Sequence, residues 1–187
     1  MKKVLLVIVV LFTNFCFGQV LSEDFESVTA PALPNGWTSS TQATNGYTGY
    51  YTGNETEANL AGYWPVTANG SASFAMTNDD VQNEILCDEL LISPTIDFTG
   101  LSNVQLSFIA YHDGLYGSGD ATVEVSIDGG TNWAVIGTLS PAASWESYVL
   151  SLSSFDNESA VLIGFRWNDG GDCAGVDNRG TGLDIDD

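Results

Sequence analysis

The stretch Ala121-Thr-Val-Glu-Val-Ser-Ile-Asp-Gly-Gly-Thr-Asn-Trp133 carries the clearest structural pattern in this sequence. Small or apolar residues occupy positions 121, 123, 125 and 127, and polar residues occupy the positions between them. Strict alternation of this kind is typical of a β-strand with one buried face. Asp128–Trp133 supplies the glycines and polar residues of a tight turn, and Trp133–Ile136 has the composition of a second strand. The stretch therefore predicts an antiparallel hairpin.

The same alternation recurs in other parts of the chain. It is found in Val104–Ala110, Tyr148–Leu152 and Val161–Trp167. Each run is short, rich in β-branched or aromatic residues, and bounded by Gly, Asn, Asp or Ser. The pattern predicts an all-β protein, most simply two antiparallel sheets packed as a sandwich.

The segment Asp79–Ile92, DDVQNEILCDELLI, gives an ambiguous pattern. Its apolar residues at 81, 85, 86 and 90 lie near helical spacing, and Asp79 or Asp80 is a suitable N-cap. Pro94 closes the segment, because the residue before proline favours extended geometry. Periodicity alone leaves helix and strand open here.

Residues 1–18 have the features of a secretory signal peptide. Lys2 and Lys3 precede the apolar run Val4–Phe12, and Gly18 offers a small residue at the expected cleavage point. A spanning helix needs roughly 20 apolar residues, and Thr13 and Asn14 interrupt this run too soon for a membrane anchor. No membrane insertion of the mature chain is expected. We predict a secreted or cell-surface protein with one domain over residues 19–187, in which residues 35–70 form long loops over one end of the sandwich.

The charge balance excludes several classes of partner. After removal of the leader, Arg166 and Arg179 are the only strong cations against 24 acidic residues, a balance of 2 − 24 = −22. Such a surface repels nucleic acid and anionic membranes, whose phosphates are bound by Lys and Arg. The acidic residues are either solvated or partly neutralised by bound cations.

The cysteine count is compatible with one disulfide. The mature chain keeps Cys87 and Cys173, and an even number in an exported protein favours pairing, although sequence does not show that the two approach each other. With one histidine, His112, a zinc site of thiolates and imidazoles is not expected.

Several landmarks occur in an order that resembles a known family. They are EDFES (Glu23–Ser27), LPNGWT (Leu33–Thr38), CDELLISPTIDFTGL (Cys87–Leu101), LSFIAY (Leu106–Tyr111), VEVSIDGGTNW (Val123–Trp133) and LDIDD (Leu183–Asp187). The set resembles the cleaved adhesin domain, a MAM-like jelly roll of gingipain-type proteases and other exported bacterial proteins.

The resemblance adds three expectations about structure. It favours a strand over a helix for Glu89–Ile92, and a jelly-roll arrangement of the two sheets. It also identifies Leu183–Asp187 as the start of a final strand whose remainder, together with further domains, lies beyond this sequence.

The resemblance also implies a structural calcium ion at the edge of the sandwich. Its ligands would come from Glu26, Asp79, Asp186 and Asp187. Calcium prefers oxygen ligands, and this acidic chain has many. Neighbouring strand residues point to opposite faces, so Asp186 and Asp187 need not both bind; Asp186 is the favoured one. The alternative is that these are solvated turn and strand-end residues.

Two groups of aromatic residues receive different interpretations. Trp37, Trp133, Trp145 and Trp167 follow strand patterns and are expected in the core. The loop cluster Tyr47, Tyr50, Tyr51, Tyr63 and Trp64 is embedded in Gly, Thr and Asn, and would form a ligand platform if exposed together. The alternative is that these rings pin long loops onto the sandwich.

The sequence contains no recognisable catalytic motif. SIDGGTNW (Ser126–Trp133) nearly matches an Asp box, in which the carboxylate bonds nearby backbone N–H groups as a structural turn. The sequence therefore predicts a non-catalytic adhesion or ligand-binding module with a structural calcium site. Its partners would be an extracellular protein or glycan and further domains of the same polypeptide. The alternatives are an accessory domain of a secreted peptidase or glycoside hydrolase and a free-standing glycan-processing enzyme.

Overall fold

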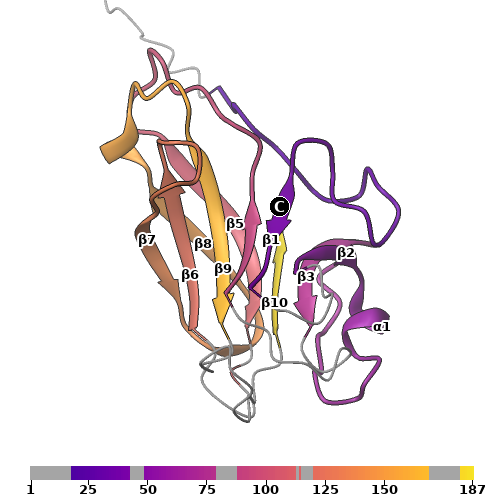
Figure 1. Cartoon of the computed structure of the whole chain (residues 1–187). Coiled ribbons are helices and arrows are strands. Elements are labelled where there is room, and N and C mark those ends of the chain that lie inside the picture. Colours follow the sequence, from indigo (N-terminus) through magenta and orange to yellow (C-terminus); the bar gives the residue numbers. More distant parts are fainter. Residues whose placement is uncertain (1–17, 43–48, 79–87, 113, 115–119, 169–181) are drawn as a thin grey trace, which may run out of the picture.

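The computed structural model describes residues 18–42, 49–78, 88–112, 114, 120–168 and 182–187. Two five-stranded antiparallel sheets form a sandwich (Figure 1). The first sheet has the order β1 (Thr38–Ser40), β4 (Glu89–Ile92), β9 (Leu162–Asn168), β6 (Asp120–Ser126), β7 (Ala134–Leu139). The second has the order β2 (Tyr51–Gly53), β3 (Phe74–Asn78), β10 (Gly182–Asp186), β5 (Gln105–His112), β8 (Ala142–Ser151). A short helix, α1 (Glu55–Ala58), and one 3₁₀ turn, Ser153–Phe155, complete the described elements.

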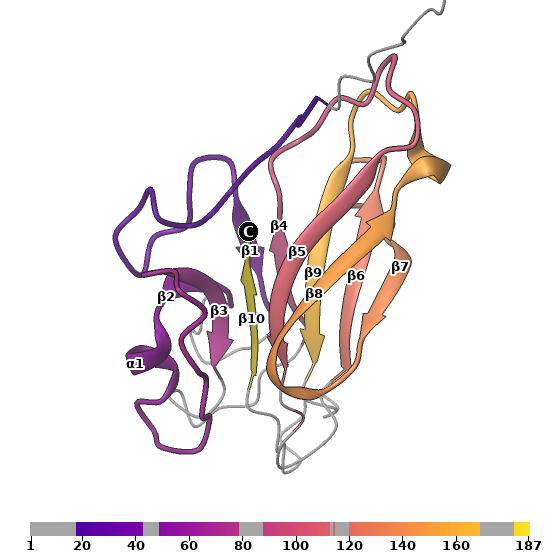
Figure 2. The same cartoon turned by 180° about the vertical axis from the view of Figure 1, so that it is seen from behind.

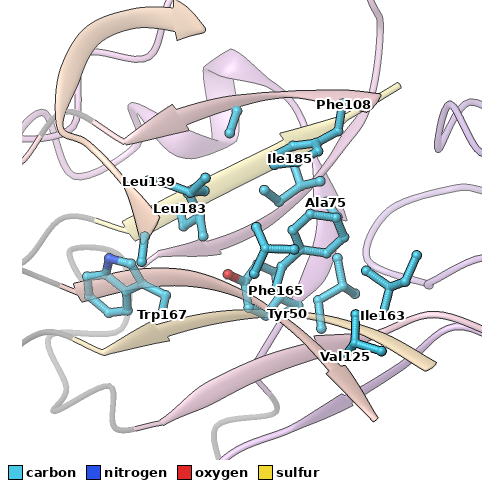
Figure 3. Close-up of a cluster of buried hydrophobic side chains, with 14 of the residues drawn as sticks. Tyr50, Ala75, Phe108, Val125, Leu139, Ile163, Phe165, Trp167, Leu183 and Ile185 are labelled. Carbon is cyan, nitrogen blue, oxygen red and sulfur yellow. The ribbon is translucent and has the colours of Figure 1, made fainter. Parts of the chain in front are cut away.

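The alternating residues of the strands fill the space between the sheets. Phe165 and Trp167 of β9 face Leu183 and Ile185 of β10 in this main core, which Figure 3 shows from within. Phe108 stacks on Tyr148 and meets Phe165 edge-on, with ring centroids 5.1 and 5.0 Å apart. The all-β sandwich and the strands predicted from alternation are therefore confirmed.

The ambiguous segment ends in a strand. Leu90 pairs with Arg166 and Leu91 with Phe165, and β1 pairs on the other side of β4. The helical alternative is wrong for Glu89–Ile92, because pairing between two neighbouring strands outweighs a local helical spacing. Residues 79–87 lie outside the described residues.

A second apolar cluster lies on the outer face of the β2–β3–β10–β5–β8 sheet. Ala58, Trp64 and Val66 cover Phe74 and Met76 of β3 there. Gly182 is required beneath this layer, because a Cβ atom at that position would lie 2.0 Å from the Thr77 carbonyl oxygen and 2.7 Å from the Trp64 ring. The expected position of residues 35–70 over one end of the sandwich is therefore wrong for the segment after β2. We call residues 54–72 the outer layer.

The outer layer is fixed by polar contacts as well as by packing. Asn54 caps α1 by accepting hydrogen bonds from the amides of Thr56 and Glu57, and the Glu57 carboxylate accepts one from the Asn54 amide. Asn78 of β3 donates to the Ala58 carbonyl at 2.9 Å, inside the protein. The capping bonds fix α1 within the layer, and the Asn78 bond attaches the layer to the strand that it covers.

Residues 183–186 of the segment Leu183–Asp187 belong to the central strand β10. β10 pairs with β3 on one side and β5 on the other, so Ile185 lies opposite both Ala75 and Ala110. The expectation of a strand is confirmed. No helix among the described residues is long and apolar enough to cross a membrane. The signal-peptide prediction concerns residues that, apart from Gly18, the structure does not describe.

Candidate cation site and ligand surfaces

Asp186 lies on the outer face of β10, beneath the outer layer. Leu183 and Ile185 point into the main core, so Asp186 points the other way. It has no exposed surface. Its Oδ2 accepts a hydrogen bond from Asn69 Nδ2 at 2.6 Å, and its Oδ1 accepts one from the Asp187 amide at 3.1 Å. A carboxylate is thus buried between a strand and the layer that covers it.

Glu26 reaches the same stretch of the outer layer from the N-terminal segment. Its Oε1 accepts hydrogen bonds from the amides of Ala72 and Ser73. The turn that presents Glu26 is held by Asp24, whose Oδ1 accepts from the Glu26 amide at 3.1 Å. Next to it, Phe25 is buried against Trp37, with ring centroids 5.3 Å apart. Residues 69–73 are therefore held by Asp186 at one end and Glu26 at the other, and we call this region the Glu26–Asp186 junction.

Burial raises the pKa of the Asp186 carboxyl above its ordinary value. Hydrogen bonds from Ser71, Asn69 and the Asp187 amide oppose the shift without cancelling it, and the Asp187 charge adds to it. The ionised form of Asp186 is thus disfavoured in the fold, because water is excluded from it. A cation beside the carboxylate would stabilise the ionised form and lower this pKa.

The junction contains the oxygen donors that calcium prefers, from two of the four predicted ligands. Glu26 and Asp186 are brought to one loop, which also offers the Asn69 amide oxygen and backbone carbonyls. Asp187 is exposed at the end of β10, and Asp79 lies outside the described residues. Within the described part of the chain, no group of three or more His, Cys, Asp or Glu could hold a metal. Any site here would therefore depend on amide and carbonyl oxygens beside the two carboxylates.

Sequence reasoning did not identify Asn69 and Ser71 as partners of Asp186. The bond between Asn69 and Asp186 joins residues 117 positions apart. The available signal was the Asn-Gly-Ser triplet at 69–71, which is a turn sequence: Asn69 Oδ1 accepts from the Ser71 amide at 3.0 Å. That signal predicts a turn but not the strand against which it packs.

The Asp box is confirmed as a structural turn. Asp128 Oδ1 accepts hydrogen bonds from the amides of Thr131 and Asn132, at 3.1 and 2.9 Å. Bonds from Asn132, first the backbone and then the side chain, and from Ser126 lower the pKa of Asp128 to about 2. Trp133 donates from Nε1 to the Gly130 carbonyl at 3.0 Å. The charge of Asp128 is satisfied inside its own turn.

The predicted aromatic platform is not what the structure contains. Tyr50 is buried in the main core and Trp64 in the second cluster, on opposite faces of one sheet. Tyr51 is half-buried against the second cluster, whereas Tyr63 is 59% exposed. Tyr50, Tyr51 and Trp64 fit the alternative interpretation, in which aromatic rings fasten loops onto the sandwich. Tyr47 lies outside the described residues, as do Cys87 and Cys173, whose pairing stays a prediction.

The tryptophans expected in the core divide by degree of burial. Trp167 is fully buried in the main core, and Trp37 packs against its edge. Trp145 packs against the second cluster instead, and its Nε1 donates to the Thr67 carbonyl at 2.6 Å. Trp133 is half-buried outside both clusters, in the Asp-box turn.

The outer face of the other sheet carries an ion-pair network. Arg166 of β9 donates from Nε and Nη2 to the two carboxylate oxygens of Glu124, each at 2.9 Å. Its Nη1 pairs with Asp88. The Arg166 guanidinium is thus paired with two neighbouring carboxylates, and these ion pairs give it a structural role in the sheet.

No protein-family model and no curated protein sequence matches this chain. Solved structures do match it. The K1 cleaved adhesin domain of Lys-gingipain from Porphyromonas gingivalis W83 aligns over 90% of this chain and 95% of its own, with a TM-score of 0.62 and 20% identity.

Two further domains of the same protease agree with this match. The K2 domain covers 88% of this chain and 95% of its own at a TM-score of 0.60 and 20% identity. The K3 domain, also from Porphyromonas gingivalis, covers 90% and 95% at a TM-score of 0.57 and 18% identity. At this level of identity the matches establish a shared fold over nearly the whole chain, and they leave the ligand open.

Proposed function

We propose that this chain, which has the fold of cleaved adhesin domains, is an exported, non-catalytic module for adhesion or ligand binding. The observation that carries the proposal is the alignment of about 90% of the chain with three domains that are named as adhesins. An extracellular protein or glycan is the expected partner, and the strongly acidic composition argues against nucleic acid.

Calcium at the Glu26–Asp186 junction forms the second part of the proposal. Glu26, Asp186 and the oxygens of residues 69–73 would hold the ion, with Asp187 and Asp79 as the other predicted ligands. A bound cation would supply the positive charge that the buried Asp186 carboxylate lacks among the described residues. The chain's own residues would then fix the N-terminal segment, the outer layer and β10 to one another.

An accessory domain of a secreted peptidase or glycoside hydrolase remains the second candidate. The observation in its favour is that the matched domains belong to a protease, Lys-gingipain. In that case the module would position an enzyme on its substrate, and its own surface would still be a binding surface.

The proposal is tested with residues 19–187 produced alone and immobilised in calcium-containing buffer. Soluble polysaccharides and a panel of extracellular matrix proteins are passed over the surface, and the same probes are checked for cleavage. Saturable binding of at least one probe without cleavage is the expected result. Turnover of a glycoside or peptide bond by this domain, or no binding of any probe, would contradict it.

A further inference from the structure

Among the described residues, the outer face of the β2–β3–β10–β5–β8 sheet is covered over part of its width and exposed over most of β5 and β8. The outer layer covers β2, β3 and β10 and also reaches Tyr111 of β5 and Trp145 of β8, whereas the rest of these two strands lies beside it and faces the viewer in Figure 2. The residues of β5 and β8 that alternate with the main-core residues point outward. They are Gln105, Ser107 and Ile109 of β5 and Ser147, Val149 and Ser151 of β8. We call these six residues the β5–β8 tract.

The tract has no ionisable side chain, although the whole sequence has 24 acidic residues. The outer face of the other sheet differs, because it carries Arg166 and Glu124. Carboxylates lie beside these uncharged side chains, because Asp186 pairs with Ile109 and a hollow at Ser107 is also lined by Glu23 and Asp187. Their negative charge disfavours an anionic ligand at the tract.

The chemistry of the tract is that of a hydrogen-bonding surface with small apolar patches. Antiparallel pairing places Ser107 opposite Val149, and Gln105 opposite Ser151. The first pair and the pair Ile109–Ser147 each combine a hydroxyl with an aliphatic group, whereas Gln105 and Ser151 are both polar and can both donate and accept. Val149 is 66% exposed. This combination suits a ligand that has hydroxyl groups along its edges and C–H groups on its faces.

The two ends of the tract support a ligand that runs along it. At one end, Trp145 is half-buried against Phe74 and Tyr111, and its Nε1 is fixed to the Thr67 carbonyl, so the ring is held rigidly beside the tract. At the other end, Gln105 lines a cavity of about 290 Å³. The other lining residues, Gln19, Val20 and residues 101–104, have uncharged side chains, although Gln19 would carry the α-amino group of the mature chain and Asp156 accepts hydrogen bonds from the amides of Asn103 and Val104. Uncharged side chains therefore continue beyond the end of β5.

A folded protein partner fits the tract less well. Stable protein interfaces use roughly 20–30 residues on each side, with aromatic and Arg side chains at their centres. The tract offers six side chains, none of them aromatic, and the Trp145 ring lies beside one end.

We propose that the β5–β8 tract binds an uncharged polysaccharide chain laid along β5 and β8. The inference rests on the proposed function and narrows its partner to neutral glycans. Serine hydroxyls and the Gln105 amide would pair with sugar hydroxyls, while Val149, Ile109 and the Trp145 ring would contact the apolar faces of the sugars.

The test is affinity gel electrophoresis of residues 19–187 in gels that contain neutral polysaccharides: a β-glucan, a xylan, a galactan and a mannan. Polygalacturonate serves as the anionic counterpart. We expect retardation by at least one neutral polymer and none by polygalacturonate. Ser107→Glu and Val149→Glu, both at exposed positions, should each weaken retardation at least tenfold. The control Thr138→Glu adds the same charge to an exposed position on β7 and should leave retardation unchanged.

The outcomes separate this inference from the proposed function. Neutral-glycan binding that survives both tract variants overturns the inference and leaves the module's function standing. Binding of matrix proteins alone has the same meaning, and so does binding of polygalacturonate that is equal to that of the neutral polymers. Absence of any binding contradicts both. Circular dichroism melts of the variants show whether a loss reflects unfolding.

Discussion

Asp128 and Asp186 are two aspartates with several hydrogen-bond donors each, and their pKa values move in opposite directions. Asp128 lies in an exposed turn, where bonds from Asn132 and Ser126 lower its pKa to about 2. Asp186 is buried between β10 and the outer layer, and burial raises its pKa despite three hydrogen bonds. Hydrogen bonds stabilise a carboxylate only when they outweigh the loss of water. The carboxylate of Asp128 is thus stabilised by its own turn, whereas a bound cation would stabilise the ionised carboxylate of Asp186.

The largest predicted effect is the response of stability to calcium. At about 100 times its dissociation constant, calcium should stabilise the domain by about 2.7 kcal/mol, which raises the melting temperature by roughly 5–10 °C. Asp186→Asn and Glu26→Gln should each abolish this gain in thermal melts with calcium and with chelator. Asp128→Asn is the control and should keep it. Equal gains in all four proteins would mean that calcium acts elsewhere.

A second prediction compares the amide partners of the two carboxylates, without calcium. Asn69→Ala removes the donor to the buried Asp186 and should cost about 1–3 kcal/mol, because no water replaces the lost bond. Asn132→Ala removes a 2.6 Å side-chain bond to the exposed Asp128 and should cost under about 0.5 kcal/mol, because the backbone bond and solvent remain. Urea unfolding measures both, and a larger loss for Asn132→Ala would contradict the comparison.

The smallest predicted effect is a pair of opposite pH dependences in chelator. A folded-state pKa of about 2 against an ordinary 3.8 means that Asp128 stabilises the fold above about pH 4, and that this contribution is lost as pH falls toward 2. A raised pKa means that Asp186 favours the fold most at pH values below the ordinary 3.8. That contribution is lost as pH rises through the folded-state pKa.

The two pH dependences are separated by comparing each Asn variant with the parent protein at a series of pH values. Relative to Asp128→Asn, the parent protein should lose stability as the pH falls from about 4 toward 2. Relative to Asp186→Asn, it should lose stability toward neutral pH. Urea midpoints give both differences, and slopes of the same sign would show that the environments of the two aspartates are not opposite.

The sequence predicts those features of the fold that depend on residues close together in the chain. Alternation between positions 121 and 127 is sufficient to identify β6, since the buried face recurs at every second residue. The Asp box was predictable for the same reason, because Ser126, Asp128 and Trp133 make their contacts within one turn.

The features that sequence missed depend on pairing between distant segments. Proximity in the chain groups Tyr50 with Trp64, yet Tyr50 faces the main core and Trp64 covers the opposite side of the sheet. Periodicity says nothing about which strand an irregular segment will cover. The partnership of Asn69 with Asp186 required knowing that the outer layer folds onto β10, and composition of residues 35–70 gave no sign of this.

Calcium binding itself tests the central comparison most directly. Isothermal titration of calcium into residues 19–187, after removal of metal with chelator, should give one site per chain. Asp186→Asn should lose the site, and Asp128→Asn should retain it with unchanged affinity. A parent protein that binds no calcium, or an Asp186→Asn variant that binds as tightly as the parent, would contradict the account.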